Sequence, residues 1–403
     1  MLSVRWRAAG ILAASVLVLQ PGTAEAQTSA DLFDSQVLHE IRLYINSRDL
    51  RDLRARYLEN VYYTADFQWR GIRVRNVAVR VRGAASRSVT KPGLRIDFDR
   101  YVTGQRFLGL RSLVLDNLWQ DASMLREVLS MAMFERMGQP ASRESFCRLY
   151  VNNVLHGVYA IVEAVEPEFL ARTLGENTGY LFEFHRLGVY TGEELGGHAA
   201  YKPLFEARTR RLEADTILYS PIRDLFREAN HPVDAVWRER VERYVNLEAF
   251  VSYVAIEAFI AEYDGILGWM GMNNFYLYRP SDNAVHRFIP WDKDLAFEYI
   301  DYPIFERAGD NPLTRGALAF PDLRALYLDV LAQCARIALQ DDWLAGEMRR
   351  LLAVIQSDAL SDSLKQFSNE QFERAIEAIE SFVAERPLFV LKEVAAAGGR
   401  PVE

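Results

Sequence analysis

The pattern of apolar and polar positions changes along the chain from short strand-like segments to longer helical ones. Strand-like segments, rich in β-branched and aromatic residues, occur at residues 37–45, 62–69, 72–82 and 94–98. In the third segment every second residue is apolar, with one slip of phase after Asn76. This alternation predicts a sheet with one buried and one solvated face. A short helix is predicted between the first two strands, at residues 47–58.

The next elements mix one helix with one hairpin. The spacing predicts a helix at residues 122–137, with Asp121 as its N-cap and Gly138 as its C-cap. Two strand-like runs follow, at 146–151 and 156–165, and the dipeptide between them, Asn152-Asn153, favours a tight turn. Pro167 then begins a helical turn.

The remainder of the chain is predicted to be mainly helical. Residues 186–216 are polar and irregular and indicate an exposed insertion, and helical patterns resume at residue 217. Helices are expected at 247–263, 321–338, 341–355, 358–366 and 369–396. A β-rich part followed by a helical part predicts a two-lobed α+β architecture. We place the β-rich lobe at residues 27–166, the helical lobe at 167–396 and a flexible tail at 397–403.

The N-terminus has the features of a secretory signal peptide. Arg5 and Arg7 precede an apolar run of about a dozen residues, and Ala24-Glu25-Ala26 then provides a small-residue cleavage site. An uncleaved anchor is the alternative, but the run falls short of the roughly 20 residues that a membrane helix needs. We therefore expect cleavage after Ala26 and a secreted or periplasmic protein without stable membrane insertion.

Charge and cysteine content bear on the expected binding partners and on disulfide bonding. The 403 residues carry a formal net charge of −8, with no basic stripe, so nucleic acid is not expected as a partner. The only two cysteines are Cys147 and Cys334. In an oxidising compartment they form either one disulfide or two buried free thiols, and neither has neighbours at metal-ligand spacing.

The segment from residue 264 to residue 294 carries the strongest chemical signal. Asp264 is followed nine and ten residues later by Asn273 and Asn274, and two strand-like runs then lead to Asp292 and Asp294. If the runs pair as a hairpin, its open end gathers these side chains. Carboxylate and amide oxygens are the ligands of a hard divalent cation, and a further carboxylate can serve as a general base. This combination favours phosphoryl transfer.

Other interpretations of the same residues remain open. An Asp-Gly pair at a helix end is often only a turn, and Asp264 with Asp292 or Asp294 could form the carboxylate pair of a hydrolase. That scheme leaves both asparagines without a role. A secreted binding or surface module with a kinase-like fold and no turnover is the more serious alternative, because exported compartments hold little ATP.

Several stretches together resemble the CotH (spore coat protein H) kinase family, a secreted group of atypical kinases. They are VRGAASRSVTKPGLRIDF, RFLGLRSLVLDNLWQDASMLREVLSMAMFERMGQPA, RLYVNNVLHGVYAIVEAV, DGILGWMGMNNFYLYR, RFIPWDKDLAF and FVAERPLFVLKEV. They occur in the family's order between about residues 37 and 396. The resemblance implies an atypical protein-kinase-like fold of two lobes, and ATP with Mg²⁺ or Mn²⁺ between them.

The resemblance also implies roles for the acidic segment. Asp264 would orient or deprotonate the acceptor hydroxyl. Asn273 or Asn274, together with Asp292, would hold the metal. Asp294 would lie behind these ligands if the strand continues, or would bind metal if the strand has ended.

Four residues of the first part are implied to contact the nucleotide or to support its site. Lys91 would bind the ATP phosphates, although a lysine before a proline is often a solvated loop residue. Arg82 would assist with the backbone of residues 83–91, since no G-x-G-x-x-G motif is present. Glu127 would pair with Lys91. Glu163 would border the adenine, or it is a core residue paired with an arginine.

Three departures from the family pattern accompany the resemblance. Asn153 replaces the glycine of an Asn-Gly turn, Glu183 stands where a lysine often follows a G-x-L-Y run, and Glu298 replaces a glycine after the acidic motif. The function expected from the whole sequence is an exported kinase that phosphorylates Ser or Thr hydroxyls of a protein acceptor or of itself.

Overall fold

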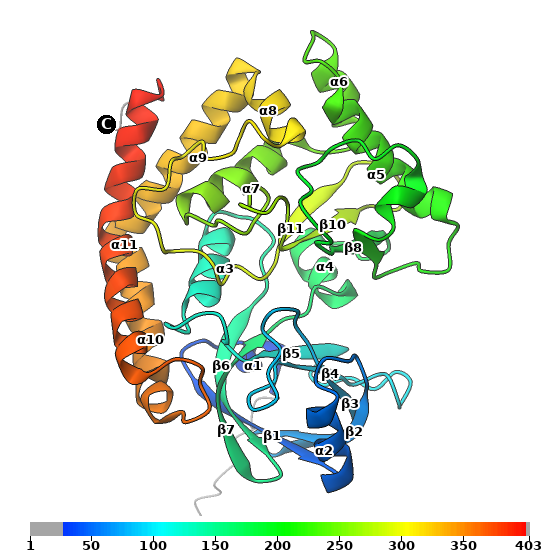
Figure 1. The fold of residues 1–403 in the computed structure, drawn as a ribbon, viewed down its shortest axis with the longest axis vertical. Coiled ribbons are helices and arrows are strands. Elements are labelled where there is room, and N and C mark those ends of the chain that lie inside the picture. The colour runs from blue at the N-terminus through cyan, green and yellow to red at the C-terminus, as the bar shows by residue number, and fades with distance from the viewer. Residues whose placement is uncertain (1–26, 400–403) are drawn as a thin grey trace, which may run out of the picture.

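The computed structural model describes residues 27–399, in which a β-barrel and a mainly helical part lie one above the other (Figure 1). The predicted signal peptide and the last four residues of the predicted tail lie outside these residues. Seven strands form the barrel: β1 (Leu38–Ile45), β2 (Tyr63–Trp69), β3 (Ile72–Val81), β4 (Leu94–Asp97), β5 (Ser112–Asp116), β6 (Glu144–Val151) and β7 (Val154–Val162). Their order is β1-β2-β3-β4-β5-β7-β6, and the barrel closes where β1 pairs in parallel with β6.

The barrel strands follow the predicted alternation. Ile41, Leu43 and Ile45 of β1 point into a closed core, with the polar residues between them less buried. The slip of phase in β3 is confirmed at Asn76, whose φ of 55° places it in the left-handed region. Asparagine tolerates this conformation better than other non-glycine residues. The strand β5 was missing from the sequence-based prediction.

The predicted hairpin turn between β6 and β7 is confirmed. Asn152 and Asn153 have φ values of 49° and 65°, as a tight turn with positive φ at both central positions requires. The Asn152 side chain adds two hydrogen bonds, from Ile45 N to its Oδ1 at 2.9 Å and from its Nδ2 to Ile45 O at 2.8 Å. Asparagine therefore shapes the turn and also fixes it to β1.

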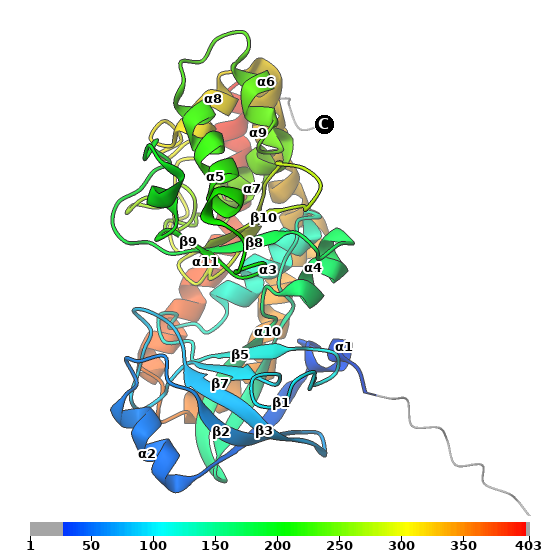
Figure 2. The same ribbon diagram turned by 90° about the vertical axis from the view of Figure 1, so that its right-hand side faces the viewer.

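The second part surrounds a four-stranded sheet of order β11-β10-β8-β9 (Figures 1 and 2). Its strands are β8 (Tyr180–Phe184), β9 (Phe205–Ala207), β10 (Phe275–Arg279) and β11 (Arg287–Pro290). Its helices are α4 (Pro167–Leu174), α5 (Asp215–Asn230), α6 (Trp237–Glu242), α7 (Leu247–Phe259), α8 (Pro312–Leu318), α9 (Pro321–Leu339), α10 (Trp343–Ser361) and α11 (Asn369–Ala396). Two short helices, α1 (Ser29–Leu32) and α2 (Ser47–Ala55), adjoin the barrel.

Several predicted boundaries were wrong. The region 186–216 is not wholly irregular, because it contains β9, and β8 precedes it. Helix α8 was missing from the sequence-based prediction, and no separate helix exists at 358–366, because α10 continues to Ser361. Asp121 is not the N-cap of the helix that follows. It caps the preceding turn, accepting from Ser123 N and Arg126 N at 2.8 Å each, and α3 (Arg126–Arg136) begins only at Arg126.

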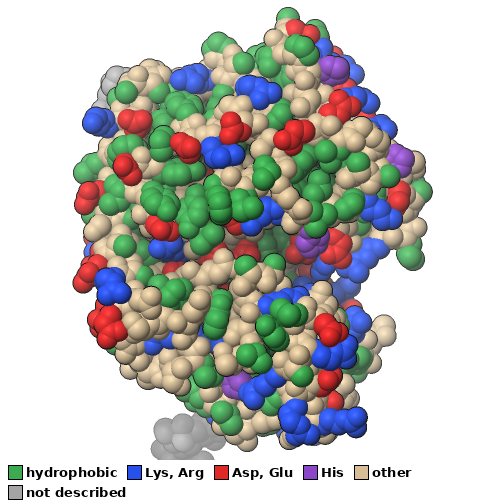
Figure 3. Space-filling model, viewed as in Figure 1, with side chains coloured by type: hydrophobic (Ala, Val, Ile, Leu, Met, Phe, Trp, Pro, Cys, Tyr) green, Lys and Arg blue, Asp and Glu red, His purple; other side chains and the backbone are tan. Residues whose placement is uncertain are grey.

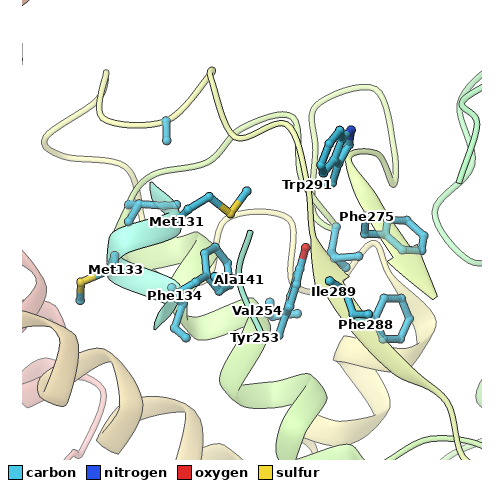
Figure 4. Packing of buried hydrophobic residues seen from close by; sticks show 14 of the residues in the cluster. Met131, Met133, Phe134, Ala141, Tyr253, Val254, Phe275, Phe288, Ile289 and Trp291 are labelled. Atoms are coloured by element: carbon cyan, nitrogen blue, oxygen red, sulfur yellow. The ribbon is translucent and has the colours of Figure 1, made fainter. Parts of the chain in front are cut away.

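Helix α3 packs with the helical part, although the chain reaches it from the barrel. Figure 4 shows Met131 and Phe134 of α3 beside Tyr253 of α7, with Phe288 and Ile289 of β11 close by. The rings of Phe134 and Tyr253 have centroids 5.3 Å apart. This apolar layer supports the end of the β10–β11 hairpin, where the predicted site lies.

The two parts have separate cores and are joined by α10, which packs against β6 and β7 as well as against α9 and α11. The α+β class predicted from the sequence is therefore confirmed. Cys147 lies in the barrel core and Cys334 in the helical core, and both are free, so the disulfide alternative is wrong. Among the helices of residues 27–399, none is long and apolar enough to span a membrane.

Candidate active site

The β10–β11 hairpin brings the predicted residues together at its open end. Phe275 pairs with Pro290, and the next backbone contact runs from Trp291 N to Asn274 O at 3.3 Å. Asn273, Asn274, Asp292, Asp294 and Asp264 all line one cavity of about 590 Å³ between the two parts. Since β11 ends at Pro290, Asp294 reaches the cavity beside Asp292 instead of pointing to the opposite face.

Asp264 is the most tightly held side chain of this group. Its Oδ2 accepts from Asn273 Nδ2 at 2.9 Å and from Asn274 Nδ2 at 3.2 Å, and its Oδ1 is ion-paired with Arg186. The chain reaches it from α7 through a turn in which Asp264 N donates to Glu262 Oε1 at 2.7 Å. The carboxylate is therefore fixed in direction before any ligand arrives.

The backbone around these residues is strained, and a buried ion pair holds it in place. Asn274 and Asp292 have φ values of 57° and 53°, a left-handed conformation that is uncommon for residues other than glycine and that clusters at functional sites. Lys293, which lies between Asp292 and Asp294 in the chain, is fully buried. Its Nζ donates to Glu257 Oε1 at 2.6 Å and to Asn274 O at 2.9 Å. The lysine thus joins α7, the asparagine pair and the acidic loop.

More carboxylates gather behind the cavity than cations to neutralise them. Asp116 at the end of β5, Glu127 on α3 and Glu144 at the start of β6 join Asp292 and Asp294, and we call these five residues the acid cluster. Glu144 is 6% exposed, and neither of its carboxylate oxygens has a hydrogen-bond partner among the described residues. A buried carboxylate in this state needs a proton or a cation.

Burial and repulsion between carboxylates raise the pKa values of Glu127, Glu144, Asp292 and Asp294. Desolvation raises the pKa of Asp292 to about 6, although Arg82 opposes the rise. Desolvation, followed by the charge of Asp292, raises the pKa of Asp294 well above its usual value. For Glu127 and Glu144 the pKa also rises well above the usual value, chiefly through desolvation. Strongly perturbed carboxyl groups in a cleft are typical of functional sites.

Two of the six arginines that line the cavity are paired with acids of the site. Arg82, just after β3, donates from Nη1 to Asp116 Oδ2 at 2.6 Å, and its guanidinium lies 5.6 Å from the centroid of the Trp291 ring. Arg186, in the loop after β8, pairs with Asp264. Both line the cavity, and the role of Arg82 at the nucleotide phosphates stays a prediction.

Lys91 does not reach the cavity, which corrects the prediction that it binds phosphates. Its side chain is fully buried between the barrel and the helical part, and its Nζ donates to Asp362 Oδ2 at 2.7 Å. Asp362 also accepts from Val158 N at 3.0 Å, and a Cβ on Gly157 would lie 2.1 Å from this carboxylate. Lys91 therefore anchors the end of α10 to the barrel.

Two further predictions need correction, because the side chains involved are paired with other residues. Glu127 does not pair with Lys91, because Lys91 is engaged elsewhere and the cation near Glu127 is Arg82. Glu163 does not border an open site. Its carboxylate is held by Arg143 at 2.7 Å and by Arg172 at 2.5 Å, so it is the arginine-paired core residue of the alternative interpretation.

A smaller polar cluster lies at the rim of the cavity on β8 and β9. Glu183, His185 and Glu206 place one potential metal-ligand atom each within 4.8 Å of one another. His185 Nε2 lies 2.9 Å from Glu206 Oε2, and Arg208 lies 3.4 Å from Glu183 and 3.2 Å from Glu206. Arg208 thus brings positive charge beside Glu183, the position at which the family often has a lysine.

Sequence reasoning missed Asp116, Glu144, Arg186 and Lys293. Two of them had a local signal: Asp116 ends the apolar run 112–116, much as Asp292 follows an apolar strand, and Lys293 lies between two predicted site acids. Glu144 and Arg186 had none, because they reach the site through barrel closure and through a loop that pairs Tyr190 with Gly271.

Comparison with known proteins identifies the family of this chain. The sequence model of the CotH kinase protein family matches residues 79–390, which span the barrel from β3 onward and most of the helical part. This chain belongs to the CotH kinase family. It is also 23% identical over 367 residues to the inner spore coat protein H of Bacillus subtilis (strain 168), covering 87% of this chain and 95% of that protein.

Proposed function

We propose that this CotH-family protein is an exported phosphotransferase that moves the γ-phosphoryl group of ATP to a Ser or Thr hydroxyl, with Mg²⁺ or Mn²⁺ as cofactor. One observation carries the proposal: Asp264 is oriented by two asparagine amides at the edge of a cavity that the acid cluster backs. A fixed acid beside a cation-demanding cluster meets the requirements of phosphoryl transfer, in which positioning and charge neutralisation supply most of the catalysis.

The residues fit a hard divalent metal. Asp292 and Asp294 line the cavity. Asn273 and Asn274 donate from their side-chain nitrogens to Asp264, and their amide oxygens accept no hydrogen bond from any described residue. Oxygen donors of this kind are the preferred ligands of Mg²⁺ and Mn²⁺. When bound, the metal would supply positive charge to the phosphate oxygens and relieve the repulsion within the acid cluster.

The protein's own groups would divide the remaining work. Asp264 would accept a hydrogen bond from the acceptor hydroxyl and direct its oxygen at the γ-phosphorus. Arg82, aligned by Asp116, would donate to phosphate oxygens at the barrel side, while Arg186 would do so beside Asp264. Lys293 contacts no ligand in this scheme. It keeps Asn274 and the acidic loop in their left-handed conformations.

A kinase-like module without turnover is a second candidate, favoured by one specific observation. Arg186 occupies Oδ1 of Asp264, so the acid has less freedom to receive a hydroxyl than an unpaired carboxylate would. The protein would then bind nucleotide or partner at the same cavity without transferring phosphate.

Incubation of the mature protein with γ-labelled ATP, Mn²⁺ and a Ser/Thr peptide library separates the two candidates. The phosphotransferase predicts label on peptide or on the protein itself, abolished by EDTA. Nucleotide binding without any transfer, under Mg²⁺ as well as Mn²⁺, would favour the silent module and overturn the proposed activity.

A further inference from the structure

A second and larger hollow adjoins the active-site cavity on its outer side. It measures about 1130 Å³ and lies between the β4 side of the barrel and the loop that follows β9. Figure 3 shows the molecule hollowed between its two parts, with Lys and Arg side chains at the rim. Arg95 and Arg208 line both spaces, so the hollow and the cavity adjoin one another. We call the larger space the arginine groove.

The charge of the arginine groove is opposite to that of the chain. Its lining has six arginines against four carboxylates, in a protein of net charge −8. Arg95 is paired with Glu166, and Arg210 with Glu213 at 3.1 Å. Arg100 and Arg211 are exposed and form no ion pair with any residue that the structure describes. Arg100 lies over the ring of Tyr62 at 4.0 Å, which holds its guanidinium at the groove wall.

The groove is also a built surface. Arg208 N donates to Leu181 O at 2.7 Å, Thr209 Oγ1 donates to Gly179 O at 2.9 Å, and Arg210 Nε donates to Thr178 O at 2.7 Å. These contacts fasten the loop after β9 to the chain at the start of β8. The arginines of this loop are thus presented from fixed backbone, which lowers the entropy cost of binding a charged partner.

The sizes of the two spaces indicate that they take different ligands. A cavity of about 590 Å³ lies within the range of sites that enclose a whole small molecule. If the nucleotide fills that cavity, the groove is free for the second substrate, whose hydroxyl must approach Asp264. An extended peptide advances roughly 3.3 Å per residue, so a groove that adjoins the cavity would hold residues a few positions from the acceptor.

We infer that the arginine groove binds an acidic segment of the protein acceptor, beside the residue that is phosphorylated; this inference rests on the proposed function. Aspartate or glutamate side chains of the acceptor pair with Arg100 and Arg211. The four groove carboxylates and the net charge of −8 disfavour a continuous polyanion such as nucleic acid. Complementary charge of this kind selects partners and speeds their encounter.

The test compares two matched peptides with one central serine, flanked either by Asp and Glu or by Asn and Gln. The groove variant is Arg100→Glu with Arg211→Glu, and the control is Arg51→Glu with Arg243→Glu, which reverses two exposed arginines outside the groove. Binding is measured by anisotropy of fluorescein-labelled peptides, and transfer by kcat/KM with ATP and Mn²⁺. We expect wild type to favour the acidic peptide, and the groove variant to lose about tenfold on it alone, in both readouts.

Four results would overturn the inference. They are equal affinity of wild type for both peptides, unchanged acidic-peptide binding in the groove variant, a raised KM for ATP in that variant, and tighter binding of a single-stranded oligonucleotide than of the acidic peptide. The raised KM would assign the groove to the nucleotide. Arginine-dependent binding of the acidic peptide without any phosphate transfer would keep the groove assignment and would count against the proposed activity alone.

Discussion

The buried charges at two places in this molecule differ in how they are balanced. At the junction of the barrel and α10, Lys91 meets Asp362 at 2.7 Å, and Asp362 also accepts two backbone N–H groups. Behind the cavity, the acid cluster places five carboxylates near Arg82, and Glu144 accepts no hydrogen bond from any residue that the structure describes. The charges of Lys91 and Asp362 are balanced without a ligand, whereas the acid cluster requires protons or a cation.

Whether a buried charge has a matching partner distinguishes structural from functional residues better than the depth of its burial does. Lys91 and Glu163 are as deeply buried as any group at the cavity, yet each is matched by local partners. Removing a charge from a matched pair leaves its partner uncompensated, while removing one from an overcrowded cluster relieves repulsion. The two regions should therefore respond to mutation in opposite directions.

The largest effect is expected at Asp264. Asp264→Asn keeps the shape of the side chain but removes the charge that orients the acceptor hydroxyl, so the transfer rate should fall by about a thousandfold. The assay is label transfer from ATP at saturating Mn²⁺. Asp282→Asn, in the exposed β10–β11 turn, is the control. A loss of less than tenfold would remove Asp264 from the catalytic role.

The matched pair should show the largest loss of stability. Lys91→Met leaves Asp362 buried without its cation, and the free energy of unfolding should fall by about 3–5 kcal/mol, measured by urea denaturation. The double variant Lys91→Met with Asp362→Leu should recover part of that loss. Unchanged stability of Lys91→Met, together with lost nucleotide affinity, would restore the phosphate-binding role.

The overcrowded cluster should respond with the opposite sign. Glu144→Gln removes one carboxylate from the repelling group, so the metal-free protein should gain about 1 kcal/mol of stability at pH 8. The same substitution at Glu163, which is matched by two arginines, should destabilise. Destabilisation by both substitutions would contradict the proposed difference between the regions.

A smaller effect on the stability of the metal-free protein is expected from a change of pH. The pKa of Asp292 is about 6 in the folded protein against an ordinary value of 3.8, so the folded state binds this proton more tightly than the unfolded state. Stability of the metal-free protein should therefore fall as pH rises from about 4 through 6, and Mn²⁺ should reduce the fall. Thermal midpoints at pH 5 and pH 7.5, with EDTA or Mn²⁺, measure it. A midpoint that rises with pH in EDTA would contradict this assignment.

The sequence identified what is local and missed what the fold assembles. The hairpin that gathers Asn273, Asn274 and Asp292 was predictable because its strands are adjacent in the chain, and its turn has ordinary turn residues. Barrel closure between β1 and β6 was not predictable in this way. Neither was the pairing of Lys91 with a residue 271 positions away, because periodicity contains no information about which distant carboxylate lies opposite.

The central claim is that a metal bound at the acid cluster holds a nucleotide in the cavity, and the thermal unfolding midpoint tests it most directly. The chain from Gln27 onward is heated with ATP alone, with Mn²⁺ alone and with both, beside its Asp292→Ala variant. A ligand that binds only the folded state must raise the midpoint. We predict a rise with ATP and Mn²⁺ together that the variant lacks. An equal rise in the variant, or none in wild type with either Mg²⁺ or Mn²⁺, would contradict the claim.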